Sequence, residues 1–200
     1  VRAHARYWVR MAGEIVRKAL VISALGYLFI AAFVFWNEGG LTVQKKEVRI
    51  YASPAEKRIF IPAIGVDANI QVVHTTASGA VGIPTNSSDV AWFNGSAPIG
   101  GAGTALIVGH VDTYVFGPGV FRGLTGLIPG DDIYTSIEGR TAHFRVVGSK
   151  IYPEGTDRMA EVIGTKEGKG HLNLITCVGE WNQTVKRYTE RLVVFADLVE

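Results

Sequence analysis

Cysteine is nearly absent from this sequence, because the 200 residues contain only Cys177. A lone cysteine excludes a disulfide within the chain and a zinc site built from several cysteines. The sequence also has no long basic run interleaved with aromatic residues, and its formal net charge is only +2. We therefore expect no nucleic-acid binding. Internal repeats and low-complexity tracts are missing as well, which argues against a repeat protein.

The one long uncharged stretch lies near the N-terminus, at residues 19–36 (ALVISALGYLFIAAFVFW). Its length is close to the roughly 20 residues with which a helix crosses a bilayer. The residues before it carry an excess of positive charge: Arg2, Arg6, Arg10, Arg17 and Lys18, opposed by Glu14. We predict a transmembrane signal anchor in the cell membrane, with residues 1–18 in the cytoplasm and everything after residue 36 outside.

Two other interpretations of residues 19–36 fit less well. A cleaved signal peptide would have a shorter apolar core and a cleavage site of small residues, whereas residues 35–40 read FWNEGG. A buried core helix would show a polar face, which this stretch lacks.

The rest of the chain divides into a polar segment and a β-rich domain. Residues 37–57 are polar and mixed, and we interpret them as a stalk. From residue 58 to residue 200, short runs of β-forming residues alternate with Gly, Pro, Asn and Asp. Hydrophobic residues make up 48% of the sequence, which is enough to build a core. Many short strands at close spacing predict a mostly β domain, a barrel or a sandwich with little helix.

Several elements of this domain are predicted individually. The run GTALIVGH at residues 103–110 has the pattern of a strand covered on both faces. Alternation over residues 131–152 predicts a hairpin that turns at Glu138 and Gly139. The other predictions are two strands on either side of Asp67, a short helix near residues 120–124, a helical turn within 156–164 capped by Thr156 or Asp157, and last strands at 171–177 and 190–199.

Cys177 ends one of these strands, HLNLITC, and both an inert and a reactive role are open to it. A buried thiol would fill space in the core. A thiol nucleophile would need a group that exchanges protons and a cationic or hydrogen-bonding group for the developing oxyanion.

The β-rich domain offers four histidines as the proton-exchanging group: His74, His110, His143 and His171. His110 ends the predicted strand 103–110 and should project from the strand end into a loop. Taken alone, it is equally compatible with a structural role. We interpret the other three as surface side chains.

Three cationic side chains follow Cys177: Lys186, Arg187 and Arg191. Arg191 opens the strand-like run RLVVFADLV, which holds it in place, whereas Arg187 lies in a polar loop with fewer constraints. A positive charge lowers the pKa of a neighbouring thiol, and burial raises it. The sequence leaves open which effect is larger at Cys177.

These segments, in this order, resemble the sortases, the membrane-anchored cysteine transpeptidases of Gram-positive-type cell envelopes. The resemblance rests on the N-terminal anchor and on four motifs, IPAIGVDANIQVV, TALIVGHVD, LNLITC and RLVVFA. LNLITC is close to the TLITC motif of the family, with Asn173 in place of a small polar residue. The resemblance spans residues 58–199.

The resemblance implies a closed or near-closed eight-stranded sortase-type β-barrel with short helices, preceded by one transmembrane helix. It also implies that Cys177 is the nucleophile and His110 the general acid and base. Arg191 would orient the substrate and stabilise the oxyanion. Val108 and Ile175 would line the groove for the apolar part of the peptide.

Three more residues are candidates for the same site. Thr176 would lie beside the oxyanion position. Asp112 either orients His110 or caps the turn that follows, and the two roles are equally open. Trp181, in the loop of residues 178–190, either contacts substrate or packs on the rim of the barrel.

The implied reaction is acyl transfer. The thiolate attacks a backbone carbonyl within a C-terminal sorting motif of the LPxTG type, and an amine or water resolves the thioacyl enzyme. The partners are therefore secreted proteins that carry a sorting signal, and an acceptor amine on a peptidoglycan precursor or a pilin. We expect no metal ion and no organic cofactor. Calcium, which some sortases use, is a less favoured alternative because the nearby acidic residues are scattered: Glu154, Asp157, Glu161 and Glu167.

Three alternatives to this interpretation fit the sequence less well. A papain-like peptidase would carry its cysteine early, on a helix and before the histidine. A non-catalytic envelope protein on a sortase-like barrel would keep Cys177 as an inert thiol. A pilin-polymerising sortase would have an Asp-Pro-aromatic lid, where residues 53–55 read Ser-Pro-Ala, and often a C-terminal membrane helix. We favour a housekeeping-type sortase, and GHVDT followed by GPGVFRGL resembles classes E and F.

Overall fold

The computed structural model describes residues 56–113, 117–155, 159–164 and 169–199. The predicted cytoplasmic tail at residues 1–18, the anchor at 19–36 and nearly all of the stalk at 37–57 lie outside these residues. Within the described ranges, no helix has the length and apolar character needed to span a membrane.

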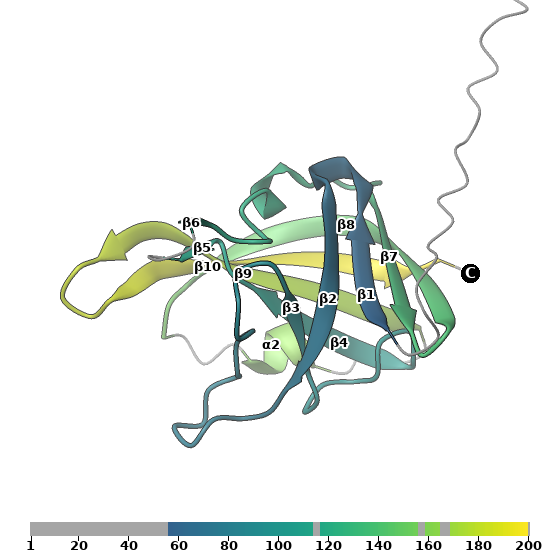
Figure 1. Ribbon diagram of the computed structural model, residues 1–200, viewed down its shortest axis with the longest axis horizontal. Coiled ribbons are helices and arrows are strands. Elements are labelled where there is room, and N and C mark those ends of the chain that lie inside the picture. Colours follow the sequence, from purple (N-terminus) through teal and green to yellow (C-terminus); the bar gives the residue numbers. More distant parts are fainter. Residues whose placement is uncertain (1–55, 114–116, 156–158, 165–168, 200) are drawn as a thin grey trace, which may run out of the picture. The chain divides into compact units, whose positions relative to one another are not determined.

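Eight strands form a closed barrel in the described part of the chain (Figure 1). In order around the barrel they are β1 (Lys57–Ile61), β2 (Val66–Val73), β3 (Val90–Phe93), β4 (Gly103–Gly109), β9 (Gly170–Asn182), β10 (Arg187–Leu198), β8 (Arg140–Pro153) and β7 (Asp132–Ile137). Strand β7 pairs with β1 and closes the barrel. All pairs are antiparallel except β2–β3 and β4–β9. The predicted mostly β fold and closed eight-stranded barrel are confirmed.

Five short elements complete the described structure. They are a two-stranded ribbon of β5 (Asp112–Thr113) and β6 (Gly117–Pro118), two 3₁₀ helices, η1 (Pro62–Ile64) and η2 (Leu124–Gly126), and the helix α2 (Met159–Ile163). The helix predicted near residues 120–124 is therefore a single 3₁₀ turn that begins at Leu124. The helical turn predicted within residues 156–164 is α2, and its expected capping residues lie outside the described residues.

Alternation along the strands gives the barrel an apolar interior and an apolar patch on its outer wall. Successive side chains of a strand point to opposite faces. In β4, Ala105 and Ile107 belong to the interior cluster, whereas Leu106 belongs to a second cluster with Val193 of β10 and Val162 of α2. All residues of β4 except Val108 are buried, so the prediction of a strand covered on both faces is confirmed.

Helix α2 covers this outer patch and is attached by two polar side chains of the barrel wall. The Thr104 hydroxyl donates a hydrogen bond to the Gly164 carbonyl at 3.0 Å. The Asn173 amide donates one to the Val162 carbonyl. Both bonds satisfy carbonyls at the C-terminal end of the helix, which have no partner within it.

Of the two turns predicted from the sequence, one is confirmed and the other lies at a different position. Glu138 and Gly139, with φ of 50° and 80°, form a two-residue turn between β7 and β8, as predicted. Asp67, expected between two strands, lies inside β2, and the break falls at Pro62–Ile64. Proline has no N–H to donate to a strand ladder, and Gly65 at φ 65° then turns the chain into β2.

The segment of residues 178–190, expected to be a loop, is the end of a β-hairpin. Strand β9 continues to Asn182 and β10 starts at Arg187, so only residues 183–186 connect them. This hairpin extends beyond the barrel wall in the yellow-green part of the ribbon, next to β5 and β6 (Figure 1).

Candidate active site

The register between β9 and β10 places Cys177 directly opposite Arg191. Residues paired across two strands point to the same face of the sheet. Ile175 and Val193 form the next pair on this face and belong to the outer cluster, so the thiol and the guanidinium both lie on the outer wall of the barrel.

His110 reaches the same position from the other neighbour of β9. In the parallel β4–β9 pair, Val108 is matched with Ile175. His110 comes directly after Gly109, the last residue of β4. The Thr176 hydroxyl donates a hydrogen bond to the Gly109 carbonyl at 2.8 Å, which keeps the two chains together up to this point. The structure therefore pairs Cys177 with Arg191 and places His110 in the segment that directly follows β4, the other neighbour of β9.

Two glycines, Gly109 and Gly119, pack closely against the residues that hold the backbone at His110. The Phe121 N–H donates to the His110 carbonyl at 2.9 Å. A Cβ atom at Gly119 would lie 2.2 Å from the His110 carbonyl oxygen, and one at Gly109 would lie 2.4 Å from the Phe121 ring. Only glycine fits at either position without moving the histidine or the buried phenylalanine.

The His110 ring has a backbone partner of its own. Its Nε2 atom lies 3.1 Å from the carbonyl oxygen of Pro84. Asp112, a candidate for orienting this ring, instead accepts a hydrogen bond from the Tyr188 hydroxyl. The contact joins the segment that follows His110 to the β9–β10 hairpin.

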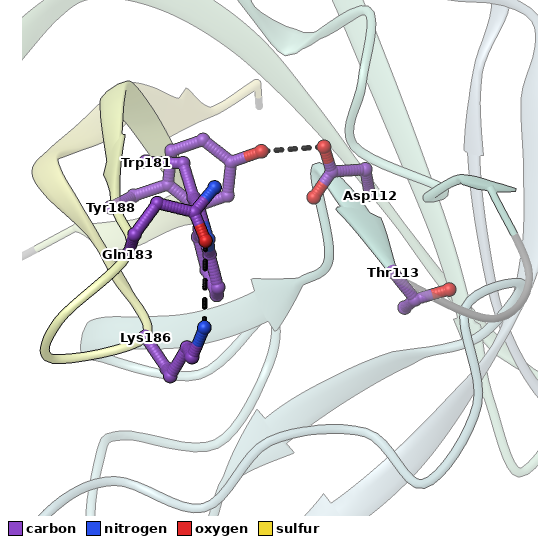
Figure 2. Close-up of a pocket in the computed structure, with 6 residues that line it drawn as sticks. All are labelled: Asp112, Thr113, Trp181, Gln183, Lys186 and Tyr188. Carbon is purple, nitrogen blue, oxygen red and sulfur yellow. Dashed lines mark hydrogen bonds between the residues drawn. The ribbon is translucent and has the colours of Figure 1, made fainter.

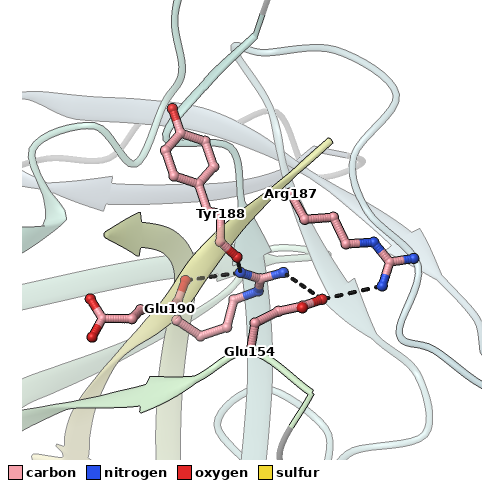
Figure 3. A network of polar contacts seen from close by, with 5 residues as sticks. Glu154, Arg187, Tyr188 and Glu190 are labelled. Atoms are coloured by element: carbon pink, nitrogen blue, oxygen red, sulfur yellow. Dashed lines mark hydrogen bonds and ion pairs between the residues drawn. The ribbon is translucent and has the colours of Figure 1, made fainter. Parts of the chain in front are cut away.

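Arg191 is held by three acceptors. Its Nη1 donates to the carbonyls of Tyr188 and Glu190, both at 2.9 Å, and its Nη2 lies 3.5 Å from the Glu154 carboxylate. Glu154 also accepts from Arg187 at 3.2 Å (Figure 3). Arg187, expected in a polar loop with fewer constraints, is therefore the first residue of β10 and part of an ion-pair network.

Burial is the largest influence on the Cys177 thiol and raises its pKa. The positive charge of Arg191 lowers the pKa, and the carboxylates of Asp112 and Glu154 raise it. The net result is a pKa above the ordinary value. The question that the sequence left open is settled in favour of burial, so the thiol is mainly protonated at neutral pH.

The predicted groove residues separate by face. Val108 and Ile175 are half-buried on the outer wall, against the apolar cluster of Phe93, Leu106, Tyr152, Val162 and Val193. The Thr176 side chain is buried and bonded to Gly109, on the face opposite the thiol. Any contact of Thr176 with substrate would therefore come from its backbone.

A pocket of about 520 Å³ lies between the hairpin and the segment after His110. Six residues line it: Asp112, Thr113, Trp181, Gln183, Lys186 and Tyr188 (Figure 2). The rings of Trp181 and Tyr188 meet edge to face at 5.2 Å. Trp181 is 44% exposed and belongs to the projecting hairpin, so it does not pack on the barrel rim.

The other three histidines lie away from this arrangement. His74 is exposed, as predicted. His143 stacks on Tyr134 and bonds to Asp132 at 2.8 Å. His171, expected on the surface, is part of β9, and its side chain is only 12% exposed and bonded to Asp197 at 2.7 Å. Strand pairing covers this residue, which the sequence placed beside a glycine-rich loop.

Metal-ligating side chains do not gather in the part of the chain that the structure describes: it contains no group of three or more His, Cys, Asp or Glu placed to hold an ion.

A family model for the sortase domain matches residues 59–199. The chain belongs to the sortase family. Sortases are cysteine transpeptidases, so this chain is an enzyme of that type. No curated protein matches its sequence.

Solved sortase structures share the fold. Sortase C-1 from Actinomyces oris aligns at 25% identity with a TM-score of 0.57, over 74% of this chain and 76% of that one. A lid mutant of sortase A from Corynebacterium diphtheriae aligns at 25% identity and a TM-score of 0.55, over 75% and 73%. A sortase D5 transpeptidase from Clostridium perfringens aligns at 20% identity and a TM-score of 0.55, over 73% and 79%.

Three residues near the sortase site were given no role at the site from the sequence alone. Tyr188 and Glu154 reach it through the hairpin and through Arg191, and Pro84 reaches it through His110. The contact of Pro84 had no local signal in the sequence.

Proposed function

We propose that this sortase cleaves an LPxTG-like sorting motif near the C-terminus of secreted proteins and transfers them to an amine of the cell wall. The observation that supports the proposal is the pairing of Cys177 with Arg191 across β9 and β10, with His110 in the segment that directly follows the neighbouring strand β4. A nucleophile, a proton-exchanging group and a fixed cation at neighbouring positions are what acyl transfer requires.

The first half of the reaction forms a thioester. The Cys177 proton moves to His110, and the thiolate attacks the carbonyl carbon of the scissile peptide bond. The guanidinium of Arg191 stabilises the negative charge that develops on the carbonyl oxygen. When the tetrahedral intermediate collapses, the C–N bond breaks, and His110 gives the proton to the leaving amine.

The second half releases the product. The acceptor amine attacks the thioester carbonyl and gives a proton to His110. The C–S bond breaks, and the proton returns to the sulfur of Cys177. With water as the attacking group, the same steps end in hydrolysis.

The apolar outer wall beside the thiol suits the apolar part of a sorting motif. Val108 and Ile175 are paired across β4 and β9, two residues before His110 and Cys177 in their respective segments. We place this sortase in the cell membrane, held by residues 19–36, with its N-terminus in the cytoplasm and its barrel outside. We assign it to the housekeeping type, of class E or F, without a metal ion or organic cofactor.

The test uses the full chain with quenched peptides that contain LPxTG, LAxTG or scrambled motifs, with and without an amine acceptor. We expect cleavage of one motif class and ligation to the acceptor, both lost in Cys177→Ala. Two acceptors distinguish the two outcomes. A peptide with an N-terminal glycine represents cell-wall attachment, and a peptide with a lysine side chain represents pilin polymerisation. A Cys177 that neither supports cleavage nor reacts with an alkylating agent would mean a non-catalytic barrel.

A further inference from the structure

The peptide bond between Pro84 and Thr85 lies between two side chains of the site region. Its carbonyl oxygen is 3.1 Å from His110 Nε2. Its N–H donates to Gln71 Oε1 at 3.1 Å. The described peptide bonds are trans, so the C=O and N–H groups of this peptide point in opposite directions. One rigid peptide group therefore connects Gln71 to the histidine.

The hydrogen-bond partners fix the direction of this connection. A carbonyl oxygen can only accept, so His110 Nε2 carries a proton and the neutral ring has its lone pair on Nδ1. The backbone N–H of Thr85 can only donate, so it meets the carbonyl oxygen of the Gln71 amide. The amide nitrogen of Gln71 then donates to Asp89 Oδ2 at 2.9 Å.

Asp89 is the fixed end of the chain of hydrogen bonds. Its carboxylate also accepts from Asn86 at 2.7 Å and from Asn69 at 3.3 Å. Burial raises the pKa of Asp89, but the hydrogen bonds from Gln71, Asn86 and Asn69 and the charge of Arg58 outweigh it, and the pKa is lowered. The carboxylate is therefore ionised at neutral pH.

The loop between Pro84 and Asp89 is itself ordered by local bonds. The Asn86 side-chain oxygen accepts from the backbone N–H groups of Ser88 and Asp89 at 3.0 and 2.8 Å. The Thr85 hydroxyl adds a second bond to Gln71 Oε1 at 3.2 Å. Pro84 is buried, so the carbonyl that faces His110 has little freedom to move.

We infer that Gln71 and Asp89 are positioning residues for His110. A chain of hydrogen bonds from the Asp89 carboxylate, through the Gln71 amide and the Pro84–Thr85 peptide, holds the ring as the Nε2–H tautomer. This leaves Nδ1 as the nitrogen that exchanges a proton with Cys177, a step that rests on the proposed function.

The chain performs through two amide groups what an aspartate does by direct contact in a Ser-His-Asp triad, where it fixes the tautomer and orientation of the imidazole. Aligned hydrogen bonds polarise one another, so removing one link weakens the others. Asp112 is committed to Tyr188. The role that the sequence suggested for Asp112 therefore belongs to Asp89.

The experiment measures the His110 ring directly, in long-range ¹H–¹⁵N spectra of the full chain labelled at histidine nitrogen. His110→Gln assigns the signals. We expect a proton on Nε2, an unprotonated Nδ1, and slow exchange of the Nε2 proton with water. In Gln71→Leu, exchange should accelerate about fivefold to tenfold, as expected for the loss of one hydrogen bond. The matched control is Asn69→Ala, which removes a bond to the same carboxylate but none to Thr85.

Peptide cleavage gives the second measurement. General acid–base catalysis contributes about 10²–10⁴-fold, and a ring that is present but loosely held should retain much of it, so we expect kcat to fall about tenfold in Gln71→Leu with KM little changed. A wild-type Nδ1–H tautomer would overturn the inference. So would exchange that is equal in wild type and Gln71→Leu, or that accelerates as much in Asn69→Ala. The expected spectra without any Cys177-dependent cleavage would support the positioning chain and contradict the proposed function.

Discussion

At Cys177, burial and charge act on the thiol in opposite directions. Burial raises its pKa most, the Arg191 charge opposes that shift, and the Asp112 and Glu154 carboxylates add to it. The cross-strand pairing of Arg191 with Cys177 keeps the two residues next to each other. The reactive thiolate is therefore a minor form at neutral pH, and its population depends on the three charges that surround it.

This balance predicts how the alkylation rate of Cys177 depends on pH. With iodoacetamide, the wild-type rate should still be rising above a pH of about 8.5, the ordinary thiol range. At pH 8, Arg191→Ala should react several-fold more slowly, because it removes the charge that favours the thiolate. Asp112→Asn should react several-fold faster, since it removes an opposing charge. Rates that move in the same direction in both variants would show that the charges do not set the reactivity.

Among the elements, the β9–β10 hairpin decides what surrounds the thiol. Its ladder pairs Tyr188 with Trp181 and Glu190 with Val178, so two residues of β9 oppose one of β10 in a bulge. Gly179 adopts φ 82° in this bulge. The Tyr188 hydroxyl is bound to Asp112, and this hydrogen bond and burial raise the pKa of Tyr188 to about 12. The phenol therefore stays a donor throughout the neutral range.

Substitution of Gly179 should disturb both stability and activity. A Cβ there would lie 2.5 Å from the Thr189 hydroxyl and 2.8 Å from the Glu190 carboxylate. We expect Gly179→Ala to lower the free energy of unfolding by about 1–3 kcal/mol, from backbone strain and crowding. Peptide cleavage should fall with it, because the bulge lies two residues after Cys177.

Urea unfolding followed by tryptophan fluorescence measures this effect. The control is Gly148→Ala, since a Cβ at that strand position meets nothing within 4 Å. It should change the free energy of unfolding by less than about 0.5 kcal/mol. Equal losses of unfolding free energy in both variants would mean that any glycine substitution in a strand has this effect, and that the bulge is not its cause.

For the molecule as a whole, closure of the barrel depends on strands that are distant in sequence. Strand β7 pairs with β1 on one side and with β8 on the other. Asp132 of β7 accepts hydrogen bonds from His143 and Arg145 of β8. Burial raises the pKa of Asp132, but these hydrogen bonds and the positive charges of their donors outweigh it, so the pKa lies below its ordinary value.

The depressed pKa of Asp132 predicts part of the acid sensitivity of the fold. The carboxylate stabilises the folded state at pH values above the unfolded-state pKa of about 3.9, and this contribution is lost as the pH falls through the lower folded-state pKa. Asp132→Asn should therefore be less stable than wild type at pH 7, and the difference should shrink as the pH falls toward the lowered pKa of Asp132. Urea unfolding at pH 7, 4 and 3 tests this.

Asp67→Asn is the control for the acid series. Its carboxylate pairs with Arg58 and its side chain is 60% exposed, and an exposed ion pair contributes little to stability. We expect it to follow the wild-type curve within about 0.5 kcal/mol. A constant difference between Asp132→Asn and wild type across this range would mean that the loss comes from packing and not from charge.

The sequence by itself determined the features that depend on neighbours along the chain. Short runs of β-forming residues predicted most strands, and a continuous apolar run predicted the doubly buried β4. Alternation on either side predicted the turn at Glu138 and Gly139. The sequence also identified His110, Cys177 and Arg191 as candidates, but its placement of Cys177 and Arg191 at strand ends is wrong, because they lie inside β9 and β10. Their motifs and order were enough to indicate the family.

Only the tertiary structure decided what each of these residues touches. Asp112 and Tyr188 are 76 positions apart, Thr176 and Gly109 are 67 apart, and His110 and Pro84 are 26 apart. Such contacts follow from the register and closure of the barrel, which no local pattern contains. Burial of the thiol, the inward face of Thr176 and the attachment of the His110 ring to the Asp89 chain all depend on which strands become neighbours.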